Sequence, residues 1–342
     1  MRYLIVRLGA IGDIVMTLPV VAAIRENDSE AHISWLCGKS VAPILKKISG
    51  IDAIIEVDEV RLFRASQLVR IAELLKIMRQ LAGRRFEKIF TFYKDWRYQI
   101  LSALAVGTRR SLSTRGYELA PGRSRLWEHV RFTIDFPQRL IPMPVLPALN
   151  WPISEELSAA NEWDDKRAVI IAPGGAKNIL RDDAVRRWPI ERYHQVAEIL
   201  IEQGHQVVLI GAPSDAWVQP YFVDLEVIDL VGKTSLPDLI GLMQRVALVV
   251  THDTGTAHLA RLANVAAINI FGPTNPAEFL GAVKWGNQEA NTRSVTFWGG
   301  ADLGCRPCYD GRNFADCDDN QCVKQIGAAQ VVEAAQKILS RP

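Results

Sequence analysis

The chain has 342 residues, of which 49% are hydrophobic and 23% are charged, and its formal net charge is +2. This composition is typical of a globular protein with a sizeable core, and the length predicts two domains. The small net charge gives no strong field for nucleic acid, so no nucleic-acid partner is expected. No apolar run reaches the ~18 residues needed to cross a bilayer, and residues 1–6 resemble a first strand rather than a signal peptide.

The first half predicts strands that alternate with helices, which indicates a parallel sheet covered on both faces. The expected strands are residues 2–8, 31–36, 53–57 and 88–92, and the expected helices are 14–25, 41–47, 65–81 and 96–105. Five prolines and little periodicity mark residues 136–152 as a linker. The domain boundary is therefore placed there, which gives an N-terminal domain of residues 1–150.

The second half repeats the alternation. Strands are expected at 168–172, 206–210, 227–230, 246–251 and 266–271, and helices at 189–203, 215–223, 236–244, 256–263 and 328–339. The second domain is taken as residues 151–325, followed by a C-terminal helical segment, 326–342. Two doubly wound α/β domains that end their strands at a shared crevice predict a ligand between them.

The turn between the expected strand 246–251 and the expected helix 256–263 is the strongest local signal. Asp253, Thr254, Gly255 and Thr256 follow a valine-rich strand and open a helix. Free backbone N–H groups and the positive end of the helix dipole favour phosphate there, and the threonines add hydroxyl donors. Asp253 suits sugar hydroxyls better than phosphate. A helix N-cap without any ligand is the alternative.

A second glycine turn, from Gly9 to Asp13, follows the first strand. It lacks the G-x-G-x-x-G spacing and the acidic residue after a second strand, which disfavours a dinucleotide-binding dehydrogenase. Gly9 and Gly12 predict a tight loop that presents the Asp13 carboxylate over a cleft. The alternative is that Asp13 only caps the helix.

Six arginines fall between residues 109 and 131, in a stretch predicted to be irregular. A solvated surface is the ordinary explanation. The functional alternative is a rim that meets an anionic acceptor, because guanidinium pairs well with carboxylate and phosphate. Arg109 and Arg115 are the candidates, together with Arg61 and Arg64, which are expected in a loop before a helix.

Four of the five cysteines are Cys305, Cys308, Cys317 and Cys322. With no secretion signal, all five are expected to be reduced in the cytoplasm. A C-x₂-C pair followed by a C-x₄-C pair is compatible with a structural zinc or iron site. Free thiols and disulfides are the alternatives.

Several motifs stand in the order found in the bacterial ADP-heptose:lipopolysaccharide heptosyltransferases of glycosyltransferase family 9, and the chain resembles that family over nearly its whole length. They are Gly9-Ala-Ile-Gly-Asp13 with Thr17-Leu-Pro19, Pro173-Gly-Gly175, Arg187-Trp-Pro189, Asp253-Thr-Gly-Thr-Ala-His258 and Phe271-Gly-Pro-Thr274. The resemblance implies a GT-B fold of two Rossmann-like domains facing a central cleft, with the final helix bracing them. It also implies an inverting transfer of heptose from ADP-heptose to the lipopolysaccharide inner core.

The same resemblance implies roles for single residues. Asp13 is the general base, which a weakly nucleophilic sugar hydroxyl requires. Asp253 contacts the heptose, and Thr254, Gly255 and Thr256 contact the diphosphate. His258, one turn further on, either faces phosphate or packs.

Other donor contacts depart from the family pattern. Arg186 stands where relatives commonly carry lysine, so the contact geometry changes although the charge is kept. Asp215 stands where glutamate is common and is expected on the nucleotide ribose. Gly174 and Gly175 allow the donor to approach the backbone closely. Trp188 is expected to be a packing residue.

Arg186 and the helix start at Thr254 supply positive potential for the leaving diphosphate without a metal, and the resemblance implies the same, so no cofactor is expected for catalysis. The expected acceptor is a Kdo-containing lipid A precursor or the first heptose on it. The enzyme is expected to be cytoplasmic, with work at the cytoplasmic face of the inner membrane left open. Other nucleotide sugars, a protein or glycan acceptor, and a non-catalytic nucleotide-sugar-binding protein remain alternatives.

Overall fold

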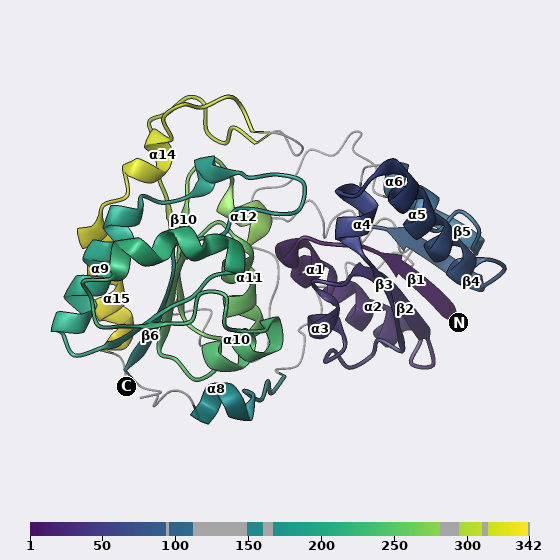
Figure 1. Ribbon diagram of the computed structural model, residues 1–342, viewed down its shortest axis with the longest axis horizontal. Coiled ribbons are helices and arrows are strands. Elements are labelled where there is room, and N and C mark those ends of the chain that lie inside the picture. Colours follow the sequence, from purple (N-terminus) through teal and green to yellow (C-terminus); the bar gives the residue numbers. More distant parts are fainter. Residues whose placement is uncertain (94–95, 112–148, 160–166, 281–293, 310–313, 341–342) are drawn as a thin grey trace. The chain divides into compact units, whose positions relative to one another are not determined.

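The computed structural model describes residues 1–93, 96–111, 149–159, 167–280, 294–309 and 314–340. The chain divides into two compact units (Figure 1). Unit 1 comprises Met1–Leu146 with Asn178–Leu180 and Ala277–Lys284; unit 2 comprises Pro147–Lys177, Arg181–Pro276 and Trp285–Pro342. The boundary at residue 150 and the separate segment from residue 326 stay predictions.

The described part of unit 1 contains a five-stranded parallel sheet in the order β3-β2-β1-β4-β5. Its strands are β1 (Arg2–Val6), β2 (His32–Gly38), β3 (Ala53–Val57), β4 (Arg85–Thr91) and β5 (Val106–Ser111). The chain runs outward from β1 in one direction and then returns to its other side at β4. The carboxyl end of β1 is therefore a topological switch point, where open α/β sheets bind ligands.

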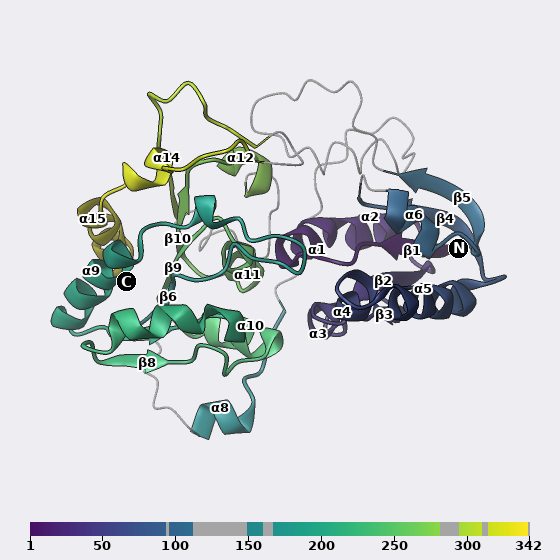
Figure 2. The same ribbon diagram turned by 45° about the horizontal axis from the view of Figure 1, so that its top comes forward.

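Helices cover the faces of this sheet (Figure 2). They are α1 (Ile11–Thr17), α2 (Pro19–Asn27), α3 (Ala42–Leu45), α4 (Glu59–Phe63), α5 (Gln67–Leu81) and α6 (Trp96–Leu101). Alternate residues of a strand point to opposite faces. Leu4 and Val6 of β1 accordingly share one hydrophobic cluster with Ile77 of α5 and Leu101 of α6.

The described part of unit 2 contains a six-stranded parallel sheet in the order β11-β10-β9-β6-β7-β8. Its strands are β6 (Ala168–Ala172), β7 (Gln206–Leu209), β8 (Val227–Asp229), β9 (Leu248–His252), β10 (Ala267–Phe271) and β11 (Val295–Trp298). Every residue of β6, β9 and β10 is buried, as expected of strands covered on both faces. The switch point lies between β6 and β9.

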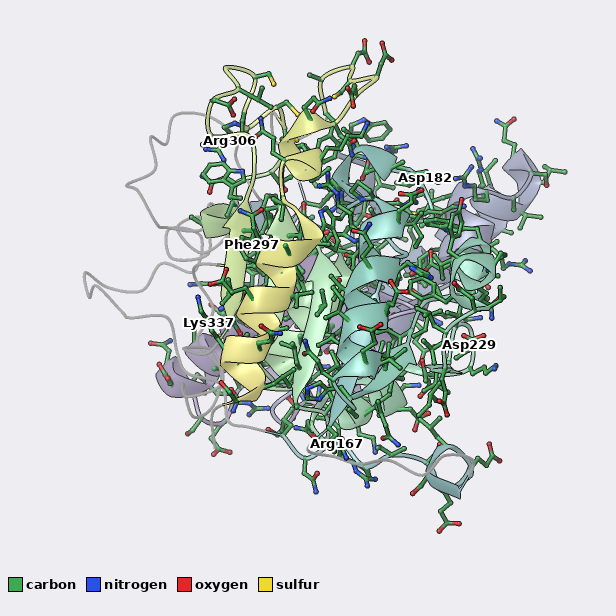
Figure 3. The ribbon with its side chains drawn as sticks, turned by 90° about the vertical axis from the view of Figure 1, so that its left-hand side faces the viewer. Arg167, Asp182, Asp229, Phe297, Arg306 and Lys337 are labelled. Carbon is green, nitrogen blue, oxygen red and sulfur yellow. The ribbon has the colours of Figure 1, made fainter. Side chains whose placement is uncertain are left out.

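The described helices of unit 2 are α8 (Glu155–Ala159), α9 (Ile190–Glu202), α10 (Leu236–Met243), α11 (Gly255–Leu262), α14 (Gln321–Lys324) and α15 (Ala328–Leu339), with 3₁₀ segments η1 (Ala184–Arg186) and η2 (Pro213–Phe222). Helix α12 (Pro276–Phe279) begins in unit 2, and its other residues belong to unit 1. Figure 3 shows α15, which carries Lys337, beside α9 over the sheet. Trp188 is buried and its Nε1 donates to the Ile326 carbonyl at 2.8 Å, which confirms its packing role.

The two doubly wound sheets confirm the predicted fold class. The helix expected at 14–25 is instead two helices, α1 and α2, because Pro19 lacks an N–H and suits a first helical position. The helix expected at 215–223 is the 3₁₀ segment η2, which has prolines at its start and inside it. None of the described helices has the length and apolarity to cross a membrane.

Candidate functional site

The loops after β6 and β9 meet at the switch point of unit 2. Gly175 has a φ of +85°, and its N–H donates to Asp215 Oδ1 at 3.0 Å. The next N–H, of Ala176, donates to Thr254 Oγ1 at 3.3 Å. A Cβ on Gly174 would lie 2.6 Å from Asp215 Cγ, and one on Gly175 would lie 2.5 Å from Thr254 Oγ1. The structure therefore brings together four of the residues predicted to bind the donor and leaves no room for a side chain at either glycine.

Asp215 joins the loop after β6 to the loop after β7. Its side chain is almost fully buried, and its second oxygen, Oδ2, accepts the Ala212 N–H at 2.9 Å. Each oxygen thus holds one backbone N–H group, a structural role that the sequence did not predict. Each oxygen has two lone pairs, so this role leaves acceptor capacity for a ribose hydroxyl. The ribose contact stays a prediction.

Helix α11 begins beside the glycine loop. Thr254 is its N-cap residue, and Gly255 and Thr256 form its first turn, both half-buried. The first N–H groups of a helix have no carbonyl partner four residues back, so this end of α11 suits an anion. His258 lies one turn further on and is buried.

Arg186 and Asp253 are neighbours at the same place. Arg186 Nη1 lies 3.5 Å from Asp253 Oδ2, and its Nη2 lies 3.3 Å from Asp183 Oδ2. Asp253 also accepts a hydrogen bond from Thr274 Oγ1 at 2.5 Å, after β10. The Arg186 Nε is buried and has no hydrogen-bond partner among the described residues. One cation therefore sits between two carboxylates, and its contact with a diphosphate stays a prediction.

His252 and Tyr193, both fully buried, form a pair beneath the turn that begins at Asp253. His252, the last residue of β9, accepts or donates a 2.9 Å hydrogen bond between its Nδ1 and the Tyr193 hydroxyl. Burial lowers the pKa of His252 to about 3, with the charges of Arg186 and Arg187 adding to the effect. The residue before Asp253 is thus neutral near pH 7.

The Asp13 carboxylate lies at the switch point of unit 1. Asp13 occupies the first turn of α1, where its Oδ2 accepts the Ala10 N–H at 2.9 Å. The side chain nevertheless remains 35% exposed. Asp13 therefore caps α1 with a carboxylate that stays partly exposed, and its role as a base stays a prediction.

Arg7 binds the same Asp13 oxygen through Nη2. Its guanidinium is buried, donates to the Phe92 carbonyl after β4, and lies 4.9 Å from the Tyr93 ring centroid. The sequence analysis missed Arg7. The available signal was an arginine directly after the apolar run Leu4–Val6, two residues before Gly9.

The expected loop position is wrong for Arg61 and correct for Arg64, which lies in the connection between α4 and α5. Arg61 lies within α4, with its Nε 3.6 Å from the buried Glu73 carboxylate, and Arg64 is the C-cap residue of that helix. Asp58 caps the start of α4 by accepting the Arg61 N–H at 3.0 Å. This cap is the local signal that the sequence analysis overlooked.

The expected irregular structure at Arg109 is also wrong, because Arg109 lies in β5. Its Nη2 donates to the carbonyls of Ser102, Ala103 and Ala105 at 3.1, 3.1 and 2.6 Å. The guanidinium thus binds the chain just after α6. Arg115 lies outside the described residues. The acceptor contacts of all four predicted arginines stay predictions.

The four clustered cysteines are free thiols. Cys305 and Cys317 are exposed, Cys308 is half-buried and Cys322 is buried. Burial raises the pKa of Cys322, and the nearby Cys308, Cys317 and Cys305 raise it further. Across the residues that the structure places, no group of three or more His, Cys, Asp or Glu side chains is arranged to hold a metal ion.

The family is decided by sequence comparison. The model of glycosyltransferase family 9 (heptosyltransferase) matches residues 132–310, more than half of the chain. The chain belongs to glycosyltransferase family 9. This family 9 protein is 24% identical over 296 residues to the lipopolysaccharide core heptosyltransferase OpsX of Haemophilus influenzae, covering 80% of this chain and 79% of that one. It is 24% identical over 357 residues to a lipopolysaccharide heptosyltransferase 3 of Escherichia coli, covering 96% of both.

Solved structures show the same fold. The E. coli heptosyltransferase WaaC with ADP matches with a TM-score of 0.69 and 16% identity, covering 99% of this chain and 100% of that one. The E. coli ADP-heptose lps heptosyltransferase II matches with a TM-score of 0.69 and 17% identity, covering 99% and 98%. This family 9 protein is therefore a glycosyltransferase of the heptosyltransferase family, as the sequence motifs predict.

Proposed function

We propose that the protein transfers heptose from ADP-heptose to the inner core of lipopolysaccharide, with inversion at the anomeric carbon and without a catalytic metal. The acceptor is Kdo-lipid A or the first heptose on it, met at the cytoplasmic face of the inner membrane. One observation carries the proposal. The partly exposed Asp13 carboxylate lies at the switch point of unit 1, and the start of α11, which suits a phosphate, lies at the switch point of unit 2.

Asp13 is the base in this proposal. Arg7 and the Ala10 N–H both engage Oδ2, which fixes the carboxylate and directs Oδ1 to the acceptor. As the acceptor oxygen bonds to the anomeric carbon, its proton passes to Asp13. The bond from that carbon to the diphosphate breaks, and ADP leaves with the electron pair. A single displacement from the opposite side inverts the anomeric configuration.

The leaving diphosphate acquires charge in this step. Arg186 and the first turn of α11 supply positive potential at one place, next to the Gly174–Ala176 backbone. Asp253, whose second contact is Thr274, supplies an acceptor for sugar hydroxyls. These protein groups can stabilise the diphosphate directly, which is the basis for proposing a metal-independent reaction.

Replacing the base tests the proposal. Asp13→Asn should lower the rate of ADP release from ADP-heptose and acceptor by about 10²- to 10⁴-fold, the usual effect of losing a positioned base. ADP affinity by calorimetry should be unchanged, since the proposed donor contacts are on unit 2. Asp28→Asn is the matched control, because Asp28 is a unit 1 carboxylate that pairs with the N-terminal amino group.

An Asp13→Asn enzyme with wild-type turnover would remove the assigned base. A donor panel tests the substrate: ADP and ADP-heptose should raise the melting temperature in proportion to ligand concentration, and UDP or GDP compounds should not. NMR of the product, showing the anomeric configuration retained, would contradict the single displacement.

A further inference from the structure

The outward side of α5 carries an apolar stripe. Ile77 and Leu81 point inward and are fully buried in the unit 1 core. Leu68, Ile71 and Leu75, by contrast, are 81%, 46% and 44% exposed. Residues three and four positions apart share one side of a helix, so these three form a continuous patch on the side away from the sheet. They are called the α5 stripe below; Figures 1 and 2 show α5 beside α4 in unit 1.

The stripe is bordered by positive charge. Residues 61–85 contain seven lysines and arginines and one acidic residue, although the whole chain has a net charge of only +2. On α5 itself the cations are Arg70, Lys76 and Arg79, all exposed.

The single acidic residue of this stretch is buried and pairs with two of these cations, so it offsets only part of the positive charge. Glu73 is 3% exposed and faces inward, where it lies 3.2 Å from Lys76 Nζ and 3.6 Å from Arg61 Nε. Its carboxylate also accepts the Asp58 N–H at 3.3 Å. Consequently α5 shows solvent apolar and basic side chains and no carboxylate.

This combination fits an anionic lipid surface. An apolar helix face inserts at the boundary between headgroups and acyl chains, and lysine or arginine beside it attracts anionic headgroups. A scattered exposed leucine needs no explanation, but a stripe on one helix face with basic borders does.

We propose that the α5 stripe docks the protein on an anionic lipid bilayer, with Arg79, four residues beyond Leu75 on the same side of the helix, at the headgroups. Docking on the bilayer needs no acceptor and is separate from heptose transfer. It rests on the proposed function only in its purpose, because an enzyme with a lipid-linked acceptor has to work at a membrane surface.

Vesicle sedimentation of the full chain tests the proposal. The wild type should sediment with vesicles of phosphatidylcholine and phosphatidylglycerol, less with phosphatidylcholine alone, and less as salt rises above about 0.1 M, because screening weakens the attraction. The triple variant Leu68→Gln, Ile71→Gln, Leu75→Gln should partition at least about tenfold more weakly. Arg79→Gln should weaken partitioning about fivefold. The matched control is Val223→Gln, which removes an equally exposed apolar side chain (82%) from unit 2 and should change nothing.

Each contrary result has a distinct meaning. Wild-type protein that stays in solution, or a triple variant that sediments as well as the wild type, would overturn the proposal. A wild-type dimer that the triple variant makes monomeric, without any vesicle binding, would assign the stripe to a second copy of the chain and also overturn it. The ADP-induced melting shift is measured on every variant as a check of folding. Vesicle binding without that shift would contradict the donor assignment and leave the docking surface standing.

Discussion

Gly175 offers the sharpest test of the loop that carries the proposed diphosphate site. In Gly175→Ala, the new Cβ would start 2.5 Å from Thr254 Oγ1, so the two atoms must separate by about 1 Å to reach van der Waals distance. The φ of +85° adds about 1–2 kcal/mol, because left-handed backbone is costly for alanine. Overpacking of this kind typically adds about 1–3 kcal/mol. The Ala176 N–H bond to Thr254 is the contact that gives way first.

Gly83→Ala is the matched control. Gly83 also has a positive φ, +68°, but a Cβ there meets nothing within 4 Å. Both variants therefore carry backbone strain, and only Gly175→Ala displaces Thr254. By titration calorimetry, ADP should bind Gly175→Ala at least about tenfold more weakly, or 1.4 kcal/mol, while Gly83→Ala keeps wild-type affinity. A folded Gly175→Ala protein with unchanged ADP affinity would refute the reasoning, as would an equal loss in both variants.

Four further predictions concern three single residues and the requirement for a metal. His252 has a folded-state pKa of about 3, below its ordinary value of 6.5, so the unfolded chain binds more protons in acid; stability to urea should be complete above about pH 6.5 and fall by about 2 kcal/mol at pH 5. His252→Asn should flatten that dependence, whereas His205→Gln, at a partly exposed histidine, should not; a wild type equally stable at both pH values would show that His252 is not buried neutral. Arg109→Met should lower stability by about 1 kcal/mol because it removes the hydrogen bonds to the chain after α6, and an acceptor KM raised without any loss of stability would instead favour the acceptor role. Arg7→Met should lower kcat but add little to the loss in Asp13→Asn, since both act through one carboxylate; additive losses would separate them. EDTA should leave transfer unchanged, and activity that is lost with EDTA and restored by magnesium would contradict the metal-independent mechanism.

Both switch points could be predicted from the sequence, for a local reason. Glycine turns directly after apolar runs, such as Gly9–Asp13 and Asp253–Thr256, mark where parallel strands end, and strand ends share one edge of a sheet. The meeting of Gly175 with Thr254 and of Gly174 with Asp215 follows from that geometry.

The partners of charged side chains could not be predicted in the same way. Arg7 contacts Phe92, and His252 contacts Tyr193, 59 residues away, so these pairs exist only once the sheets have formed. Arg109 looked like one of a group of surface arginines, yet its partners are carbonyls of the turn after α6. Sequence periodicity predicts which face of an element is buried, but it carries no information about which distant carbonyl a guanidinium will reach.

The two hydrogen bonds that hold the loop at Gly175 and Ala176 have a consequence for inhibitor chemistry. Asp215 and Thr254 hold the backbone of Gly175 and Ala176 through hydrogen bonds made within the protein itself. A small molecule that binds there need not supply the entropy of ordering a flexible segment. Fragments carrying little more than a diphosphate mimic should therefore bind with a high free energy per heavy atom, which makes this loop a favourable starting point for fragment growth.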